Sequence, residues 1–189
     1  DLNPNTGTAP VLRTRADAEI TAKIYANSPI LVPSNGDPQG DEWQLRLRTL
    51  FHKSKAAQDG HIMPAIDADL SVSDWGPAYE GDYGHQFDHR FGTFEHGSVR
   101  DVTRAEHVDP KFEPEFEWVG SRQEFERKME YWGVSLKRSA ILAFRRVARS
   151  TDERTSLAAM IPFRSVTNSW ILVLDPDPSA QAALCGAKN

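Results

Sequence analysis

Three short apolar segments near the end of the chain constrain its fold more than any other feature. They span residues 139–147, 155–163 and 169–174. Each has the length and the content of β-branched and aromatic residues that is typical of a strand. Residues 164–168 form a turn between the last two segments. The sequence therefore predicts a mixed or mainly antiparallel sheet that contains these segments.

Two capping signals predict helices, so the expected fold class is α+β. Thr14 and Asp17 open a helix from about Arg15 to Ala26, and Ser121 and Glu124 open a second helix. The second helix carries apolar residues at helical spacing and is followed by a glycine that ends it: Phe125, Met129, Trp132 and Gly133. A final helix is expected from Pro178 onwards.

The expected elements divide the chain into an arm and a domain. Residues 1–60 are expected to be a linker and helical arm, within which residues 43–56 fit a strand or a helix. Residues 61–189 are expected to hold the main core and to be truncated at the C-terminus. Within this domain, residues 85–95 alternate as a strand does, whereas the acidic, proline-broken residues 96–117 predict a loop.

The composition is that of a soluble chain whose charge is unevenly distributed. No apolar run approaches the roughly 20 residues of a membrane span, and the first residues do not resemble a signal peptide. A single cysteine, Cys185, excludes an internal disulfide, so we expect a cytoplasmic protein without a membrane partner. The net charge is −5, yet residues 137–164 hold seven basic and two acidic residues, while residues 101–130 hold nine acidic and five basic ones.

The basic segment contains the candidate binding residues. Four arginines fall within ten positions and two threonines lie among them: Arg145, Arg146, Arg149, Arg154, Thr151 and Thr155. Guanidinium groups and hydroxyls hold DNA phosphates and read guanine edges, and an apolar strand behind them would hold them rigidly. The alternative is a solvated basic face beside a capped turn. A different function also stays open, a protein–protein interaction module whose acidic region docks a basic partner.

Three blocks of sequence follow one another in the order and approximate spacing of a known family. They are NPNTGT at 3–8 with RTRADAE at 13–19, YEG at 79–81 with QFDHRF at 86–91, and FRRVARSTDERT at 144–155 with Ile161-Pro162. Together they resemble the C-terminal half of adenine-specific DNA methyltransferases, the large type IIG-like enzymes of restriction–modification and phage defence. One departure is Asp82-Tyr83, which stands where the family usually has a Lys-Met or similar pair.

The resemblance implies a DNA-recognition fragment that has no catalytic residue of its own. The parent enzyme would transfer a methyl group from S-adenosylmethionine to N6 of adenine, and its catalytic domain would be a partner of this chain, together with double-stranded DNA. The sequence contains neither the Gly-rich cofactor loop nor the Asn/Asp-Pro-Pro-aromatic motif of such a domain. We therefore expect this chain to hold no cofactor and not to methylate DNA alone.

Asp88, His89 and Arg90 form a second candidate cluster. On a strand, Asp88 and Arg90 share one face, where they can pair or share a partner. We predict that the cluster braces the fold. A metal site that includes His85 is the alternative, but strand alternation would place His85 and His89 opposite Asp88, so no metal ligand is assigned.

Overall fold

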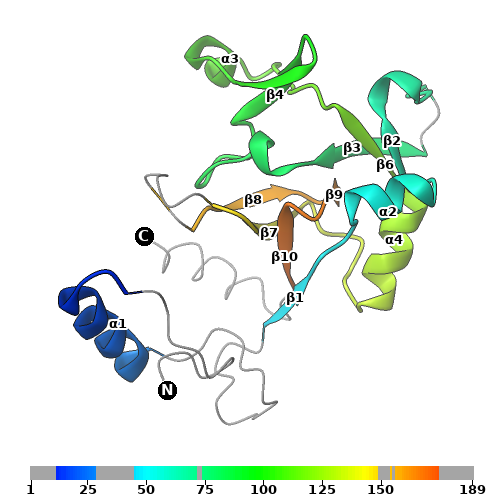
Figure 1. Cartoon of the computed structure of the whole chain (residues 1–189). Coiled ribbons are helices and arrows are strands. Elements are labelled where there is room, and N and C mark those ends of the chain that lie inside the picture. Colours follow the sequence, from blue (N-terminus) through cyan, green and yellow to red (C-terminus); the bar gives the residue numbers. More distant parts are fainter. Residues whose placement is uncertain (1–11, 29–44, 72–73, 149–153, 155, 175–189) are drawn as a thin grey trace. The chain divides into compact units, whose positions relative to one another are not determined.

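The computed structural model divides the chain into two compact units, Asp1–Arg46 and Leu47–Asn189. It describes residues 12–28, 45–71, 74–148, 154 and 156–174 (Figure 1). The boundary falls inside the predicted arm, so residues 47–60 belong to the larger unit. The final helix predicted from Pro178 lies outside the described residues.

In the smaller unit, helix α1 (Arg15–Asn27) begins where its capping signal predicts. The Thr14 hydroxyl accepts a hydrogen bond from the Asp17 N–H at 3.1 Å, and the Asp17 carboxylate accepts one from the Thr14 N–H at 3.0 Å. These bonds satisfy amide groups that the first turn of a helix leaves without partners. Ile20 and Ile24 are more than half exposed, and no residue of the helix is buried.

In the larger unit, the three apolar segments form strands of one four-stranded sheet. Its order is β1 (Arg46–Arg48), β10 (Trp170–Leu174), β7 (Ala140–Arg145) and β8 (Ala158–Pro162). Strand β7 is antiparallel to both neighbours, with Ile141 opposite Ile161. All three strand predictions are confirmed, although each strand is shorter than its predicted segment.

A second four-stranded sheet has the order β2 (Ile62–Pro64), β6 (Trp118–Ser121), β3 (Trp75–Tyr79) and β9 (Ser165–Val166). Strand β6 is antiparallel to β2 and β3, whereas β9 is parallel to β3, so the fold is α+β with antiparallel and mixed sheets. Strand β9 lies in residues 164–168, which the sequence predicts as a turn. Two paired residues are too few to give the alternation that identifies a strand.

A hairpin of β4 (Gly92–Glu95) and β5 (Ser98–Asp101) precedes helix α3 (Arg104–Val108). The loop predicted for residues 96–117 is therefore wrong for β5 and α3. His96 and Gly97 form the turn with φ values of 51° and 83°. Positive φ suits glycine, and this tight turn is what allows the acidic segment to fold back on β4.

Two further helices and two short 3-10 turns belong to the described part of the larger unit. They are α2 (Lys53–Gln58) and α4 (Arg122–Tyr131), with short 3-10 turns η1 (Ala65–Asp67) and η2 (Gly81–Tyr83). Helix α4 confirms the prediction: the Ser121 hydroxyl accepts from the Glu124 N–H, and Gly133 follows the helix with φ 72°. None of the helices in the described ranges has the length and apolarity needed to cross a bilayer.

The core of the larger unit unites residues of both sheets, α2 and α4. Trp170 and Tyr83 are its largest fully buried side chains. Leu50, Phe51 and Ala56 are also buried in it. The expectation that the core starts near residue 61 is thus wrong, because the apolar residues of 50–56 complete the core rather than an arm. Burial of these side chains supplies the main driving force for folding.

Candidate nucleic-acid interface

The predicted arginine segment, residues 145–155, begins at the end of β7. Arg145 is the last residue of that strand and is partly buried, Arg146 follows it and is exposed, and Arg154 is exposed. The Arg146 N–H donates a hydrogen bond to the Ser169 carbonyl at 2.8 Å, which fixes the backbone from which its side chain leaves. Three further candidates, Arg149, Thr151 and Thr155, lie outside the described residues.

Arg145 lies against residues of the turn that follows β3. Its Nη2 is 3.4 Å from Oδ1 of Asp82, and its side chain is 23% exposed while that of Asp82 is 74% exposed. Gly81 lies directly beside it, since a Cβ at that position would be in ordinary contact with the Arg145 Nε, at 3.5 Å. Among the described residues, this long, weak pair with an exposed carboxylate is the one hydrogen bond made by the Arg145 guanidinium, so it orients the group and engages one of its five donors.

Ser169, at the start of β10, ties the same turn to the first sheet. Its hydroxyl accepts a hydrogen bond from the Gly81 N–H at 2.8 Å and lies 2.8 Å from the Thr167 hydroxyl. The Trp170 indole N–H donates to the Glu80 carbonyl at 2.7 Å, and Lys53 Nζ lies 2.8 Å from a Glu80 carboxylate oxygen. Glu80, Gly81 and Ser169 also line a small open pocket of about 160 Å³ beside Arg145. Sequence reasoning missed Ser169, which no motif marks.

Gln86 and Phe87, a few residues further along, contact the chain beyond the C-terminal end of the arginine segment. The Gln86 side-chain carbonyl accepts from the Ala158 N–H, and the Phe87 N–H donates to the Ala158 carbonyl, both at 2.9 Å. Residues 79–91 therefore contact Arg145 and Ala158, which lie on either side of the arginine segment in sequence. They include the second block of the family resemblance, and Arg145 belongs to the third.

The strand predicted for residues 85–95 is wrong for its first part, because β4 begins only at Gly92. His85 and Asp88 exchange backbone hydrogen bonds of 2.7 and 3.1 Å across a turn. Phe87 has a φ of 63° at that turn, and its side chain is half exposed instead of lying on a buried face. The prediction that Asp88 and Arg90 share a strand face is therefore wrong, because neither residue lies in a strand.

The cluster of Asp88, His89 and Arg90 is nevertheless partly buried and bonded. The Asp88 carboxylate accepts from the Arg90 backbone N–H at 2.8 Å and lies 3.5 Å from the His107 Nε2. The Arg90 guanidinium donates to the carbonyls of His107 and Phe112, at 2.9 and 3.2 Å. Asp88 and Arg90 thus share His107 of α3 as a partner, without a side-chain ion pair between them.

A metal site that includes His85 and His89 is the alternative to this brace. Among the residues that the structure describes, no group of three or more His, Cys, Asp or Glu side chains could hold a metal ion. His85 stacks on Phe91 with ring centroids 4.7 Å apart. Burial lowers the pKa of His89, against the opposing effect of Asp88, so a neutral ring is favoured there.

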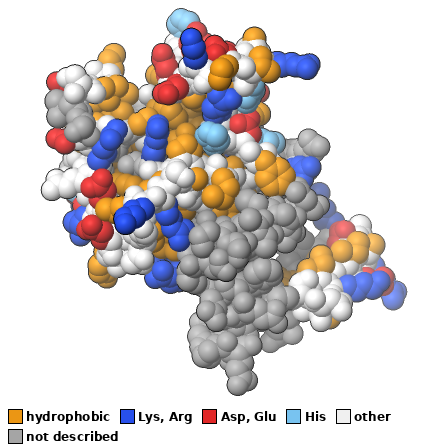
Figure 2. Space-filling model, turned by 180° about the vertical axis from the view of Figure 1, so that it is seen from behind, with side chains coloured by type: hydrophobic (Ala, Val, Ile, Leu, Met, Phe, Trp, Pro, Cys, Tyr) orange, Lys and Arg blue, Asp and Glu red, His pale blue; other side chains and the backbone are white. Residues whose placement is uncertain are grey.

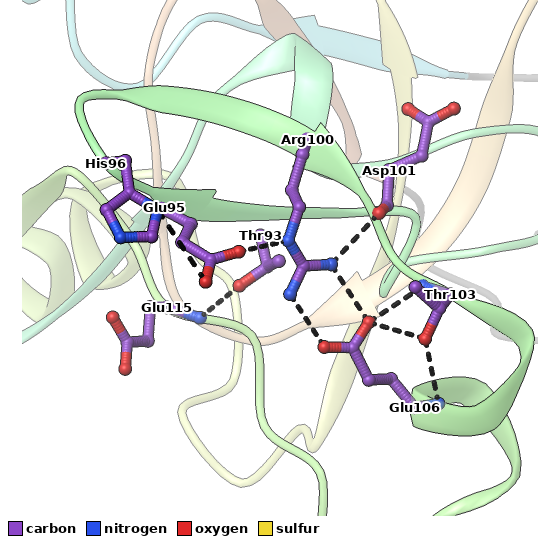
Figure 3. Close-up of polar contacts among 8 residues, drawn as sticks. All are labelled: Thr93, Glu95, His96, Arg100, Asp101, Thr103, Glu106 and Glu115. Carbon is purple, nitrogen blue, oxygen red and sulfur yellow. Dashed lines mark hydrogen bonds and ion pairs between the residues drawn. The ribbon is translucent and has the colours of Figure 1, made fainter.

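The acidic hairpin region neutralises part of its own charge. The Arg100 guanidinium donates to both carboxylate oxygens of Glu106, at 2.7 and 2.9 Å, and also to Glu95 (Figure 3). The N–H and the hydroxyl of Thr103 also donate hydrogen bonds to the Glu106 carboxylate. The hydrogen bonds from Arg100, and to a smaller extent those from Thr103, lower the pKa of Glu106 to about 2. On α4, Arg127 likewise binds Glu124 through two bonds. A module with an acidic docking surface stays a prediction, but these acids are already satisfied within the fold.

Charge on the surface is interspersed. On the face shown in Figure 2, Lys and Arg side chains alternate with acidic and hydrophobic ones instead of forming one continuous basic patch. Local arginine sites, and not net charge, would therefore have to carry any binding of nucleic acid.

Comparison with known proteins gives no relative for this chain. No protein-family model, no curated protein and no solved structure matches it.

Proposed function

We propose that this chain is the DNA-recognition fragment of a site-specific adenine-N6 DNA methyltransferase of the restriction–modification or phage-defence type. S-adenosylmethionine would bind in a catalytic domain elsewhere in the parent protein. The parent protein would act in the cytoplasm. The fragment's own task is to hold double-stranded DNA so that this domain reaches its adenine.

One observation supports this proposal most: Gly81 of the second block lies beside Arg145 of the third, since a Cβ on Gly81 would be 3.5 Å from the Arg145 Nε. Two residues outside the blocks hold this arrangement: Asp82 contacts the Arg145 guanidinium, and Ser169 accepts a hydrogen bond from the Gly81 N–H. Blocks that a family shares for a common task are expected to converge on a common site. Here the convergence leaves an arginine oriented at the end of a rigid strand, which is the arrangement that reads a guanine edge or a phosphate.

A salt titration of DNA binding tests the proposal. We expect the 189-residue chain to bind a labelled mixed-sequence duplex with an affinity that falls steeply as salt rises, because each bound phosphate releases counterions. Arg145→Ala and Arg146→Ala should weaken binding. A contact to guanine costs about 1–3 kcal/mol at the cognate site only, whereas a phosphate contact weakens binding to all sequences and lowers the salt slope by about one.

The matched control is Arg104→Ala, which removes an exposed arginine of α3 far from the arginine segment in sequence. Thermal melting of each variant checks that the fold persists. Absence of DNA binding by the wild-type chain, or binding that no salt concentration and no arginine variant changes, contradicts the proposal and favours a protein–protein module. Calorimetry with S-adenosylmethionine should show no binding to this chain alone.

A further inference from the structure

A second arginine-lined site lies away from the predicted segment. Two pockets, of about 270 and 400 Å³, both include Pro77 of β3 and Arg164 in their walls. Because they adjoin at these two residues, we treat them as one surface feature, the Arg164 groove. Nothing in the sequence motifs marked Arg164 as a site residue.

The fold holds Arg164 in a fixed position. The next residue, Ser165, is buried and begins β9, which pairs parallel with β3 through Ala78. Ser165 also packs closely on Gly120, where an added Cβ would lie 2.6 Å from its hydroxyl oxygen. The backbone next to Arg164 is therefore fixed by pairing with β3 and by the packing of the Ser165 side chain on β6, while the Arg164 side chain is exposed.

The groove has an excess of positive charge. Four arginines line it against two glutamates: Arg90, Arg122, Arg138 and Arg164 against Glu113 and Glu126. Arg164 has no hydrogen bond or ion pair to the rest of the described chain, and Arg122 bonds through Nε to the Trp75 carbonyl at 3.2 Å. Arg90 is held by neutral carbonyls. None of these three arginines is thus neutralised by a carboxylate within the described part of the chain.

Rings lie between these charges. Tyr79, Phe112 and Phe116 line one pocket, and Phe125 and Phe163 line the other. Arg164 and Arg90 line the same pocket as Tyr79 and His89. Burial raises the pKa of Tyr79 and lowers the pKa of His89, and both arginines act on each group towards a lower pKa. Guanidinium forks bind phosphate through paired hydrogen bonds, and flat apolar walls suit sugar and base surfaces.

We propose that the Arg164 groove is a second DNA-contact site, which binds phosphates of the duplex backbone through Arg164 and Arg122. The inference rests on the proposed function and extends it, since the groove shares no residue with the Arg145 site. It contributes affinity and orientation and reads no base, because its charges face a repeating phosphate and not a defined base edge.

The test uses the same duplex titration on the whole chain, with Arg164→Ala and Arg122→Ala. Each change should lower the salt slope by about one, so that the affinity ratio of wild type to variant shrinks by about fourfold between about 50 and about 200 mM salt. The loss should be equal for all duplex sequences. Arg164→Lys should retain most of the slope because it keeps the charge, and Arg104→Ala, outside the groove, should leave it unchanged.

The two proposals fail in different ways. If the wild-type chain does not bind DNA, both are overturned. If it binds with a steep salt slope that Arg145→Ala or Arg146→Ala reduces, while Arg164→Ala and Arg122→Ala leave the slope unchanged, only the groove is overturned. Because Arg164 is exposed, its loss should not shift the melting temperature, which separates lost contact from lost fold.

Discussion

At the scale of single residues, the turn between β3 and β4 depends on atoms that approach one another closely. Gly84 is one such case, since an added Cβ would lie 2.6 Å from Cζ2 of Trp170. The Trp170 ring is fully buried and its indole N–H is bonded to the Glu80 carbonyl, so it has no space into which to move. The glycine is thus required for its size.

Gly84→Ala should accordingly lower the free energy of unfolding by about 1–3 kcal/mol, the usual cost of overpacking a tight core. Urea denaturation followed by tryptophan fluorescence measures it. Gly76→Ala is the matched control, because its nearest neighbour is the Arg122 Nε at 3.4 Å, on an exposed and adaptable side chain. Equal stability of the two variants would show that the Trp170 ring is not fixed.

Asp88→Ala tests the brace formed by Asp88, His89 and Arg90. The change removes the acceptor of the Arg90 N–H and should cost about 1 kcal/mol, the value of one hydrogen bond, because no buried ion pair is broken. Asp88→Asn keeps an acceptor oxygen and should melt closer to the wild type. An alanine variant that melts normally yet binds DNA poorly would make the cluster a contact site instead.

At the scale of elements, the β4–β5 hairpin and α3 are joined by polar bonds around Arg100. Glu106 caps α3 through Thr103 and receives the Arg100 guanidinium at the same time. One carboxylate therefore holds both the helix and the hairpin, in an element with little buried apolar surface of its own.

Glu106→Gln should destabilise the domain near neutral pH and flatten its response to acid. The folded pKa of Glu106, about 2, lies below the usual value of 4.5, so the unfolded chain binds the proton more readily. Its contribution to stability is present above about pH 4.5 and is lost as pH falls towards 2. Melting temperatures from pH 7 to pH 3 measure this. Glu130→Gln, on the exposed face of α4, should leave the pH profile unchanged.

Local signals predicted these elements unevenly, for physical reasons. Side-chain capping revealed α1 and α4, because Thr14 and Ser121 contact residues only three positions away. The same Thr-x-x-Glu signal at Thr103 marks α3, but the surrounding acids and prolines favoured a loop. Strand β9 and the turn at Phe87 depend on partners far along the chain, which no local pattern contains. The Arg164 groove, built from such distant pairs, was for that reason invisible in the sequence.

At the scale of the whole larger unit, the two arginine sites lie at opposite ends of one strand pair. The Arg145 N–H bonds to the Leu157 carbonyl, and the Phe163 N–H bonds to the Ser139 carbonyl. Six residue steps along β7 separate these levels, or about 20 Å at roughly 3.3 Å per residue. A duplex that contacts both sites would do so at phosphates about six base pairs apart, given an axial rise of about 3.4 Å for each.

Strand β9 is the last strand that the second sheet of the larger unit needs. During synthesis β3 leaves the ribosome long before Ser165 and Val166 are made, so the edge of β3 that β9 will occupy stays open. An open edge is a template for wrong pairing with another chain. Only after Ser165 and Val166 have been made and have left the ribosome can β9 close that edge, and the same event brings Arg164 beside Pro77. The groove can therefore exist only on a chain whose aggregation-prone edge is already covered.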